Sequence, residues 1–219
     1  AWLKENNLTD PALQVFFGSP VFGNAVEHGS IHLAATIASR DAANESVPYW
    51  SPSNKRLLCN GMSHAGKELA LSPAEAAYLN GQGLVTGLNF TGQMVAWGNR
   101  TAAYPAVTDV KDTFIPVRRM FNYIGNTLVL TAWQFTDSPL RRRFIEQICD
   151  SFNIWLNGLA AREYILGGRV SFLADENPNT DLIDGIAKFH VYIAPPPPAR
   201  EIRFTLEYDP SYLTNLFAE

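Results

Sequence analysis

The chain has 219 residues, of which 47% are apolar, and its formal net charge at neutral pH is −4. This length is sufficient for one or two hydrophobic cores, and the acidic balance argues against a general nucleic-acid binder, which would carry a basic stripe. No apolar run approaches the length of a membrane span, so membrane insertion is not expected. Cys59 and Cys149 lie far apart without metal-type spacing, so both are expected to be reduced thiols.

The amino-terminal third of the chain predicts one strand and two helices. Residues 13–17 are typical of a short strand, and Ser30 is placed to cap a helix that runs to about Arg40. A second helix is expected to begin at Ser72, because proline follows at the first turn and Glu75 completes a capping box. This helix should end near residues 80–81, where asparagine and glycine follow.

The middle of the chain predicts a hairpin, a further strand and a helix. Residues 84–90 and 94–97 mix apolar and β-branched side chains on either side of a Thr-Gly turn signal, which is typical of a hairpin. Residues 114–117 form another short apolar run, and Pro116 would place that strand at an edge or a bulge. The apolar spacing then becomes helical, so a helix is expected over 117–133.

The clearest helix of the sequence is expected over 139–161. Its apolar residues recur at three- and four-residue steps and form one stripe: Leu140, Phe144, Ile148, Phe152, Trp155 and Leu159. Arg141, Arg142 and Arg143 lie in its first turn, where the helix dipole favours anions by about 0.3–1 kcal/mol each. This opposition leaves two interpretations open, a contact with a partner's carboxylates or a solvated basic turn.

The carboxyl-terminal region has two alternating segments separated by a proline run. Residues 187–193 alternate as a half-buried strand does, residues 195–198 are four prolines that act as a stiff extended spacer, and residues 201–207 alternate again. The fold class expected is therefore α/β (α+β), with a mixed β-sheet core, flanking helices and an extended C-terminal β-arm.

Several short motifs, taken in order, resemble the tail sheath proteins of contractile bacteriophages, especially those of P2-like phages. The motifs that carry the resemblance are AWGNRT at 96–101, the FI-x-VRR element at 114–119, AATIASRD at 34–41, the W-x-SP-x-N-like run at 50–54 and LNG at 79–81. Each motif is weak alone, but they follow one another in the family's order over most of the chain.

The resemblance implies a structural subunit rather than an enzyme. It implies polymerisation as stacked hexameric rings around a tail tube, followed by contraction that drives the tube through the host envelope. The implied partners are further copies of the chain, the tail tube protein, and the baseplate and tail terminator proteins. The implied location is the virion, after assembly in the bacterial cytoplasm. The sheath of an R-type bacteriocin or other contractile injection system is the alternative, and a hydrolase with a subtilisin-like fold is the alternative from another class.

The same resemblance divides the chain into three parts. Residues 1–83 would be the C-terminal part of a subtilisin-like sheath core domain, 84–200 the sheath C-terminal domain, and 201–219 an extended arm. Because the chain lacks an initiator methionine and is short for a sheath protein, we expect it to be a C-terminal piece of a longer one.

The resemblance implies roles for the arm and for one helix, and the chemistry of four further polar residues suggests a role for them. The arm is expected to cross to a neighbouring subunit and to bind it through its apolar residues Ile202, Phe204, Leu206, Tyr212, Leu213, Leu216 and Phe217. The alternative is that residues 201–207 pair within the subunit's own sheet. Helix 139–161, with Arg141, Arg142 and Arg143, is expected to face the tube. Four polar residues are expected to brace the subunit: Asn99, Arg100, Arg118 and Arg119. For Arg118 and Arg119, an intersubunit salt bridge is the alternative.

Catalytic patterns were weighed against these roles. No glycine-framed serine of the G-x-S-x-G type is present in the sequence. His28 and His32 stand four residues apart without the glutamate of a zinc-protease helix. Asp175, Glu176 and Asp181 fit a cation loop less well than an acidic surface loop. We therefore expect no catalysis, no cofactor and no metal.

Overall fold

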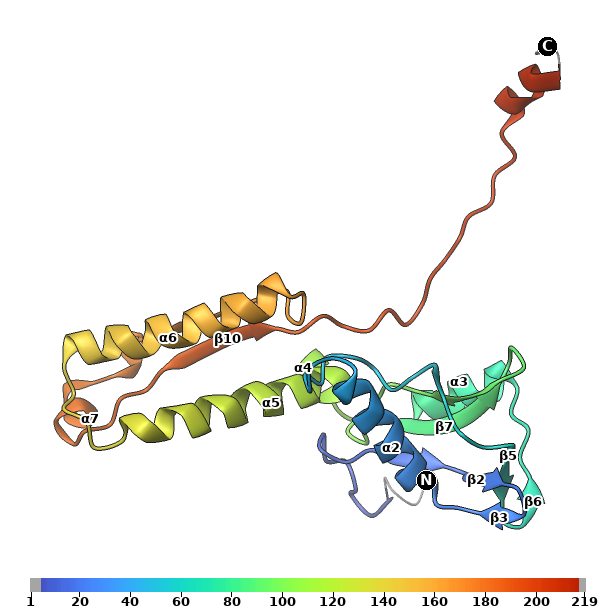
Figure 1. Cartoon of the computed structure of the whole chain (residues 1–219), viewed down its shortest axis with the longest axis horizontal. Coiled ribbons are helices and arrows are strands. Elements are labelled where there is room, and N and C mark those ends of the chain that lie inside the picture. The colour runs from blue at the N-terminus through green and yellow to red at the C-terminus, as the bar shows by residue number, and fades with distance from the viewer. Residues whose placement is uncertain (1–4, 217–219) are drawn as a thin grey trace.

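The computed structural model describes residues 5–216 and shows two lobes and a projecting arm (Figure 1). The first lobe contains two small sheets and helices α2–α4. The second lobe is elongated and contains helices α5–α7 with a two-stranded hairpin. The arm leaves the molecule between the lobes and extends away from both of them. The mixed α/β architecture expected from the sequence is confirmed.

The central sheet of the first lobe has the strand order β1-β7-β8-β4. β1 (Val15–Phe17) runs parallel to β7 (Leu84–Asn89), and β8 (Met94–Trp97) is antiparallel to both β7 and β4 (Lys55–Arg56). The register pairs Gly87 with Ala96, so the expected hairpin is confirmed within a residue at each end.

A second sheet with the order β3-β2-β5-β6 was not foreseen from the sequence. Its strands are β2 (Ser19–Phe22), β3 (Ala25–Val26), β5 (Gly61–His64) and β6 (Lys67–Glu68). They are two to four residues long, and such short segments are too brief to display the alternation that identifies a strand.

Two helices pack against strands of the first lobe, α2 (Gly29–Ala42) against β1 and β2, and α3 (Pro73–Gly81) against β7. The single turn α4 (Val110–Thr113) packs against the helix that follows it. The capping box of α3 is confirmed: the Glu75 backbone N–H donates to Ser72 Oγ at 3.3 Å, and the Ser72 backbone N–H donates to Glu75 Oε2 at 2.9 Å. One buried apolar cluster of this lobe consists of Leu33, Leu57, Val85, Ala96 and, from the start of the following helix, Ile115.

The strand expected over 114–117 is wrong. Helix α5 (Ile115–Ala132) begins there instead, and only Phe114 stays extended, with an isolated bridge to Arg100. Pro116 lies in the first turn of the helix, where a missing backbone N–H costs nothing because that donor has no intrahelical acceptor. Proline was therefore a helix-start signal in an apolar run that looked like an edge strand. A 3-10 turn, η1 (Trp133–Phe135), follows α5.

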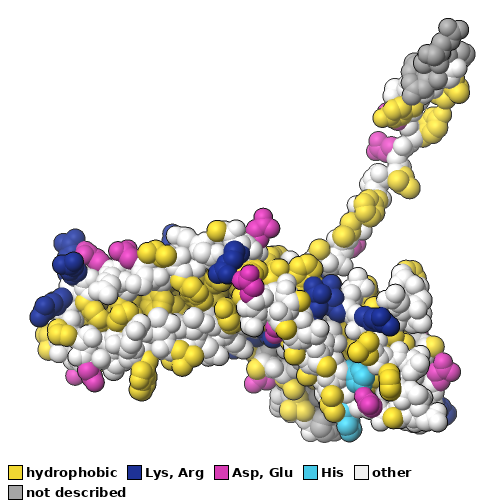
Figure 2. All heavy atoms as spheres, viewed as in Figure 1, with side chains coloured by type: hydrophobic (Ala, Val, Ile, Leu, Met, Phe, Trp, Pro, Cys, Tyr) yellow, Lys and Arg dark blue, Asp and Glu magenta, His cyan; other side chains and the backbone are white. Residues whose placement is uncertain are grey.

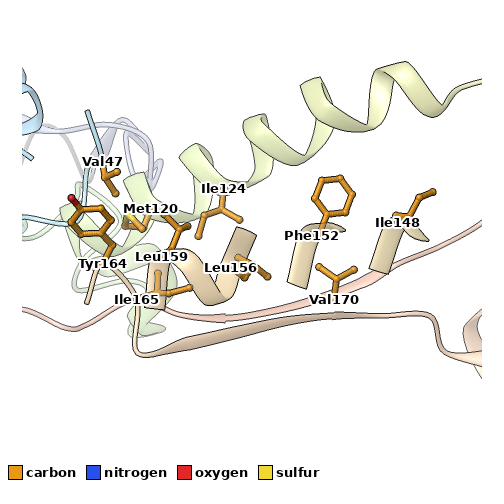
Figure 3. Packing of buried hydrophobic residues seen from close by; sticks show 10 residues of the cluster. All are labelled: Val47, Met120, Ile124, Ile148, Phe152, Leu156, Leu159, Tyr164, Ile165 and Val170. Carbon is orange, nitrogen blue, oxygen red and sulfur yellow. The ribbon is translucent and has the colours of Figure 1, made fainter. Parts of the chain in front are cut away.

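The core of the second lobe joins α5, α6 (Arg142–Ala161) and the hairpin of β9 (Gly167–Ser171) and β10 (His190–Ala194). Figure 3 shows side chains of α5 and α6 meeting those of β9 and the turn before it. Ten buried residues form this cluster: Val47, Met120, Ile124, Ile148, Phe152, Leu156, Leu159, Tyr164, Ile165 and Val170. Complete burial of a side chain such as leucine or phenylalanine stabilises by about 1.5–3 kcal/mol, so this cluster organises the lobe.

Two elements of this lobe begin later than expected. Helix α6 starts at Arg142 rather than at residue 139, so Leu140 lies before the helix and is not part of its apolar stripe. Leu156, which was not expected in the stripe, is one of the buried residues of the helix. Strand β10 starts at His190 because the Asn177 side chain binds the backbone of Lys188. It accepts from the Lys188 N–H at 2.7 Å and donates to the Lys188 carbonyl at 3.0 Å. The connection carries η2 (Ala174–Glu176) and α7 (Asn179–Ile183).

The arm is extended but unpaired. Residues 201–207 form no strand, so the alternative of pairing within the chain's own sheet is contradicted. Beyond them lies one short 3-10 helix, η3 (Pro210–Leu216), whereas Phe217 lies outside the described residues. An alternating segment forms a strand only beside a partner, and no strand of residues 5–216 lies beside this one.

Candidate functional site

The arm presents a row of exposed apolar side chains. Ile202, Phe204 and Leu206 are 71%, 85% and 94% exposed, and Tyr212, Leu213 and Leu216 are also exposed. Figure 2 shows apolar side chains at intervals along the part of the extension that the structure describes. Exposed apolar surface of this extent marks an interaction site in a folded protein.

The backbone of residues 201–207 is also without hydrogen-bond partners in neighbouring segments of the described chain. Among residues 5–216, no backbone hydrogen bond joins 201–207 to another segment. Two hydrogen bonds within the arm are local: Arg203 Nε donates to Glu201 Oε1 at 2.5 Å, and the Ser211 N–H donates to Asp209 Oδ1 at 2.9 Å. A segment with free donors, free acceptors and alternating apolar side chains is suited to adding a strand to a sheet edge.

The second lobe carries such an edge. The β9–β10 hairpin is a two-stranded sheet, so each strand is paired on one side only, and an isolated two-stranded sheet is marginally stable without further cover. Beside it lies a hollow of about 410 Å³. This hollow is lined mainly by apolar residues of α5, α6 and the β10 segment, among them Leu128, Phe144, Phe152, Phe189 and Val191.

The three arginines at the start of α6 lie at the far end of the second lobe and are exposed (Figure 2). Arg141 is the N-cap residue, and Arg142 Nε donates to Glu146 Oε1 at 2.8 Å. That hydrogen bond raises the pKa of Arg142. Arg141 and Arg143 have no ion pair within the part of the chain that the structure describes. Two of the three charges are therefore available to an anionic partner or to water.

Arg118 and Arg119 lie in the first turns of α5 and contact different acids. Arg119 forms a two-point contact with Asp41 at the end of α2, with Nη1 to Oδ1 at 3.1 Å and Nη2 to Oδ2. Arg118 Nη1 donates to Asp112 Oδ1 at 3.0 Å. The first contact joins helices of the two lobes, which is the geometry that a bracing role requires.

Arg100 is buried in the loop that follows β8. Its guanidinium lies 4.3 Å from the Tyr104 ring centre and 3.9 Å from that of Phe114, and Nη1 donates to Thr113 Oγ1 at 2.8 Å. The Asn99 carbonyl accepts from the Ile115 N–H at 2.9 Å. These contacts hold the loop against the start of α5, while the bracing role itself stays a prediction.

The residues weighed for catalysis are dispersed. His32 Nε2 lies 2.5 Å from Glu27 Oε2, whereas His28 is the N-cap residue of α2. In the acidic loop, Lys188 Nζ lies 2.6 Å from Asp181 Oδ2 and its bond lowers the Asp181 pKa. Within residues 5–216, no group of three histidine, cysteine or acidic residues is arranged to hold a metal ion. No helix in that range is both long and apolar enough to cross a membrane.

Besides the second sheet of the first lobe, sequence reasoning missed two further features. Strand β9 was not predicted, because Gly167 and Gly168 obscure its pattern. A cluster of cations around Trp50 was also missed, because its members come from four separate segments: Arg40, Lys55, Arg100 and Arg200. No local spacing in the sequence announces such a cluster.

Two curated relatives carry the sequence similarity. The chain is 30% identical over 171 residues to the tail sheath protein of Burkholderia phage BcepMu, which covers 77% of this chain and 36% of the relative. It is 27% identical over 124 residues to the major tail sheath protein of Serratia phage KSP20, covering 56% and 30%. The chain thus spans about a third of the length of the curated relatives it matches. No protein-family model matches the chain.

A solved structure shares the fold. The sheath of an extracellular contractile injection system, the PVC complex in its contracted state, superposes with a TM-score of 0.80 at 19% identity and covers 93% of this chain and 58% of that chain. At this identity the likeness shows the fold alone. Together with the sequence matches, it confirms the resemblance to contractile tail sheath proteins.

Proposed function

We propose that this chain, which is similar to contractile tail sheath proteins in sequence and shares the sheath fold, is the polymerising part of a sheath subunit. In this proposal the subunit assembles as stacked hexameric rings around a tail tube and contracts to drive the tube through the host envelope. The observation that carries the proposal is residues 201–207 of the arm, whose apolar side chains are exposed and whose backbone makes no hydrogen bond to another segment within residues 5–216.

The arm would link neighbouring copies by adding a strand to the β9–β10 hairpin of the next subunit. Each backbone hydrogen bond gained would net about 0.5–1.5 kcal/mol. Three or four apolar side chains would add roughly 1.5–3 kcal/mol each on burial in the adjacent hollow. Such a contact is strong enough to hold while rigid subunits rotate, so the arms would tether the lattice during contraction.

The start of α6 would face the tube. Arg141 and Arg143 are exposed and have no ion pair within the described range, and they lie at the tip of the longer lobe. Carboxylates of a tube protein would relieve the unfavourable position of these cations at a helix N-terminus. The baseplate and the tail terminator would bind the two ends of the polymer, and the assembled particle would place the chain in a virion tail built in the host cytoplasm.

We infer a structural role rather than a catalytic one. The named relatives are sheath proteins. The solved injection-system sheath supports a second candidate, a sheath of a bacteriocin or other contractile injection system. A subtilisin-like hydrolase is the less well supported alternative, since a shared fold does not carry a reaction.

Electron microscopy of the purified full-length protein tests the proposal. Striated tubes with a hollow centre are expected, and co-expression with the tube protein should fill that centre. Proteins that stay monomeric at high concentration and turn over a peptide or ester substrate would contradict the sheath function and support the hydrolase alternative.

A further inference from the structure

A groove lies between the root of the arm and the first lobe. It has a volume of about 740 Å³, and its walls include Trp50 and Trp97 on one side and the proline spacer with Arg200 on the other. The spacer therefore roofs a cleft instead of closing against the lobe. Nothing in the proposed strand exchange requires a cleft at this position.

The groove is basic. Lys55, Arg100 and Arg200 line it, and Arg40 lies next to it, with its guanidinium 5.1 Å from the Trp50 ring centre. Lys55 Nζ lies at the same distance, 5.1 Å, from that ring. None of the four cations forms an ion pair with an acid among residues 5–216. Figure 2 shows basic side chains on the body near the point where the arm leaves it.

Arg100 is the buried member of this cluster and is only 9% exposed. Its Nη1 is bonded to Thr113, but its Nε has no hydrogen-bond acceptor within the described residues. The pKa of Arg100 is lowered mainly by burial and to a smaller extent by the positive charge of Arg200. The pKa of Lys55 is lowered in the same way, mainly by burial and less by the charge of Arg40. A buried guanidinium with an unused donor and cationic neighbours is a site that an anion would stabilise.

We propose that this groove binds carboxylates on the arm of a second copy of the chain. The inference rests on the sheath function proposed above and adds a second contact to the strand exchange. The chain carries 21 acidic and 17 basic residues, so its own surface is the natural complement of an unpaired basic groove. Phosphates of a nucleic acid would satisfy the same cations, but the net charge of −4 repels a polyanion at long range.

The position of the groove favours the arm over other acidic segments. Strand β10 ends at Ala194, and Pro196 in the roof of the groove follows two residues later. An arm paired beside β10 therefore runs past its end towards the groove. The arm carries Glu201 at one end of its alternating segment and Glu207 with Asp209 at the other. A carboxylate reaches the groove whichever way the added strand runs.

Two measurements on the full-length chain test the inference. The first is the concentration at which tubes form, followed by sedimentation over a range of NaCl concentrations, for Lys55→Gln, Arg200→Gln and the double variant. The double variant should need about tenfold more protein, which is the change that one lost charge-assisted contact produces, and its assembly should depend less on salt. Lys67→Gln, an exposed lysine of β6, is the matched control and should assemble as the wild type does.

The second measurement does not require tubes. A synthetic peptide of residues 201–216 is titrated into the protein while tryptophan fluorescence is recorded, because Trp50 and Trp97 line the groove. We expect saturable binding that weakens about tenfold in the double variant. The same weakening is expected when the peptide carries glutamine and asparagine in place of its acids.

The outcomes separate the two proposals. If the wild type forms no tubes, the sheath function fails, and peptide binding alone decides on the groove. If tubes form but the double variant and the neutral peptide behave as the wild type does, the groove inference is overturned while the sheath function stands. Tighter binding of a single-stranded oligonucleotide than of the peptide would also overturn it, by assigning the groove to nucleic acid.

Discussion

Strand β10 and residues 201–207 have similar alternating sequences but opposite outcomes. β10 pairs with β9 in a complete register from His190–Ser171 to Ala194–Gly167, whereas the arm segment has no strand beside it among residues 5–216. Alternation of apolar and polar residues indicates that a segment can form a strand with one apolar face. The location of the partner, inside the chain or outside it, decides whether that strand exists in the isolated subunit.

The two segments should therefore affect different properties. The residues around β10 contribute to the free energy of folding of the second lobe, since they pack against its core. Those of the arm are exposed, so under the proposed function they would contribute only when copies associate. Substitutions that separate folding from assembly can test this division.

The largest effect is expected from removing residues 201–219. Assembly should be lost completely, because every proposed link between copies has the arm as one of its two sides. The melting temperature of the subunit should not change, since 201–207 make no backbone contact with the rest of the described chain. Sedimentation and circular dichroism measure the two properties. A truncated chain that is unfolded, or that still forms tubes, would contradict the division.

The next effect separates two phenylalanines. Phe152 is buried in the core of the second lobe and Phe204 is exposed on the arm. Phe152→Ala should lower the free energy of unfolding by about 3–5 kcal/mol, because it leaves a cavity in a packed core. Phe204→Ala should change it by less than about 0.5 kcal/mol, as exposed substitutions usually do, and should weaken assembly instead. Urea denaturation gives the first quantity, and equal losses of stability in the two variants would contradict the comparison.

Much of the fold could be predicted because its signals are local. The Ser72–Glu75 capping box, the hairpin at β7 and β8 and the stripe of α6 each depend on residues a few positions apart. The errors arose where one residue supports two structures. Pro116 is compatible with an edge strand and with the first turn of a helix, and only the burial of Ile115 and Val117 in the folded chain decides between them.

The candidate sites were less predictable, because their partners are distant in sequence. Arg119 and Asp41 are 78 positions apart, and the groove cations come from four segments. The exposed apolar row of the arm was visible as a pattern, but its exposure depends on the absence of a neighbouring strand in residues 5–216. A single sequence carries no physical signal for such long-range arrangements.

A smaller effect is expected from the contact between Arg119 and Asp41. It joins α5 to α2 through a two-point ion pair whose side chains are 23% and 19% exposed. A double-mutant cycle with Arg119→Ala and Asp41→Ala should give a coupling energy of about 1–2 kcal/mol, between the values for exposed and buried pairs. The same cycle on Arg118 and Asp112, a one-point contact, is the control and should give less. Coupling near zero at Arg119 would remove the bracing role.

The smallest effect is expected where the partners are nearest in sequence, at the start of α3. Two hydrogen bonds with Ser72 lower the pKa of Glu75, first in size the one with the Ser72 backbone and second the one with the Ser72 side chain. A carboxyl group whose pKa is lower in the folded state stabilises the fold above its unfolded pKa, about 4.3 for glutamate, and this contribution disappears as the pH falls through the folded value. Glu75→Gln should therefore lower the melting temperature slightly at pH 7 and by less at pH 3. Glu68→Gln, on the exposed strand β6, is the control. A difference at Glu75 that persists unchanged at pH 3 would show that the charge of the carboxylate does not contribute to the cap.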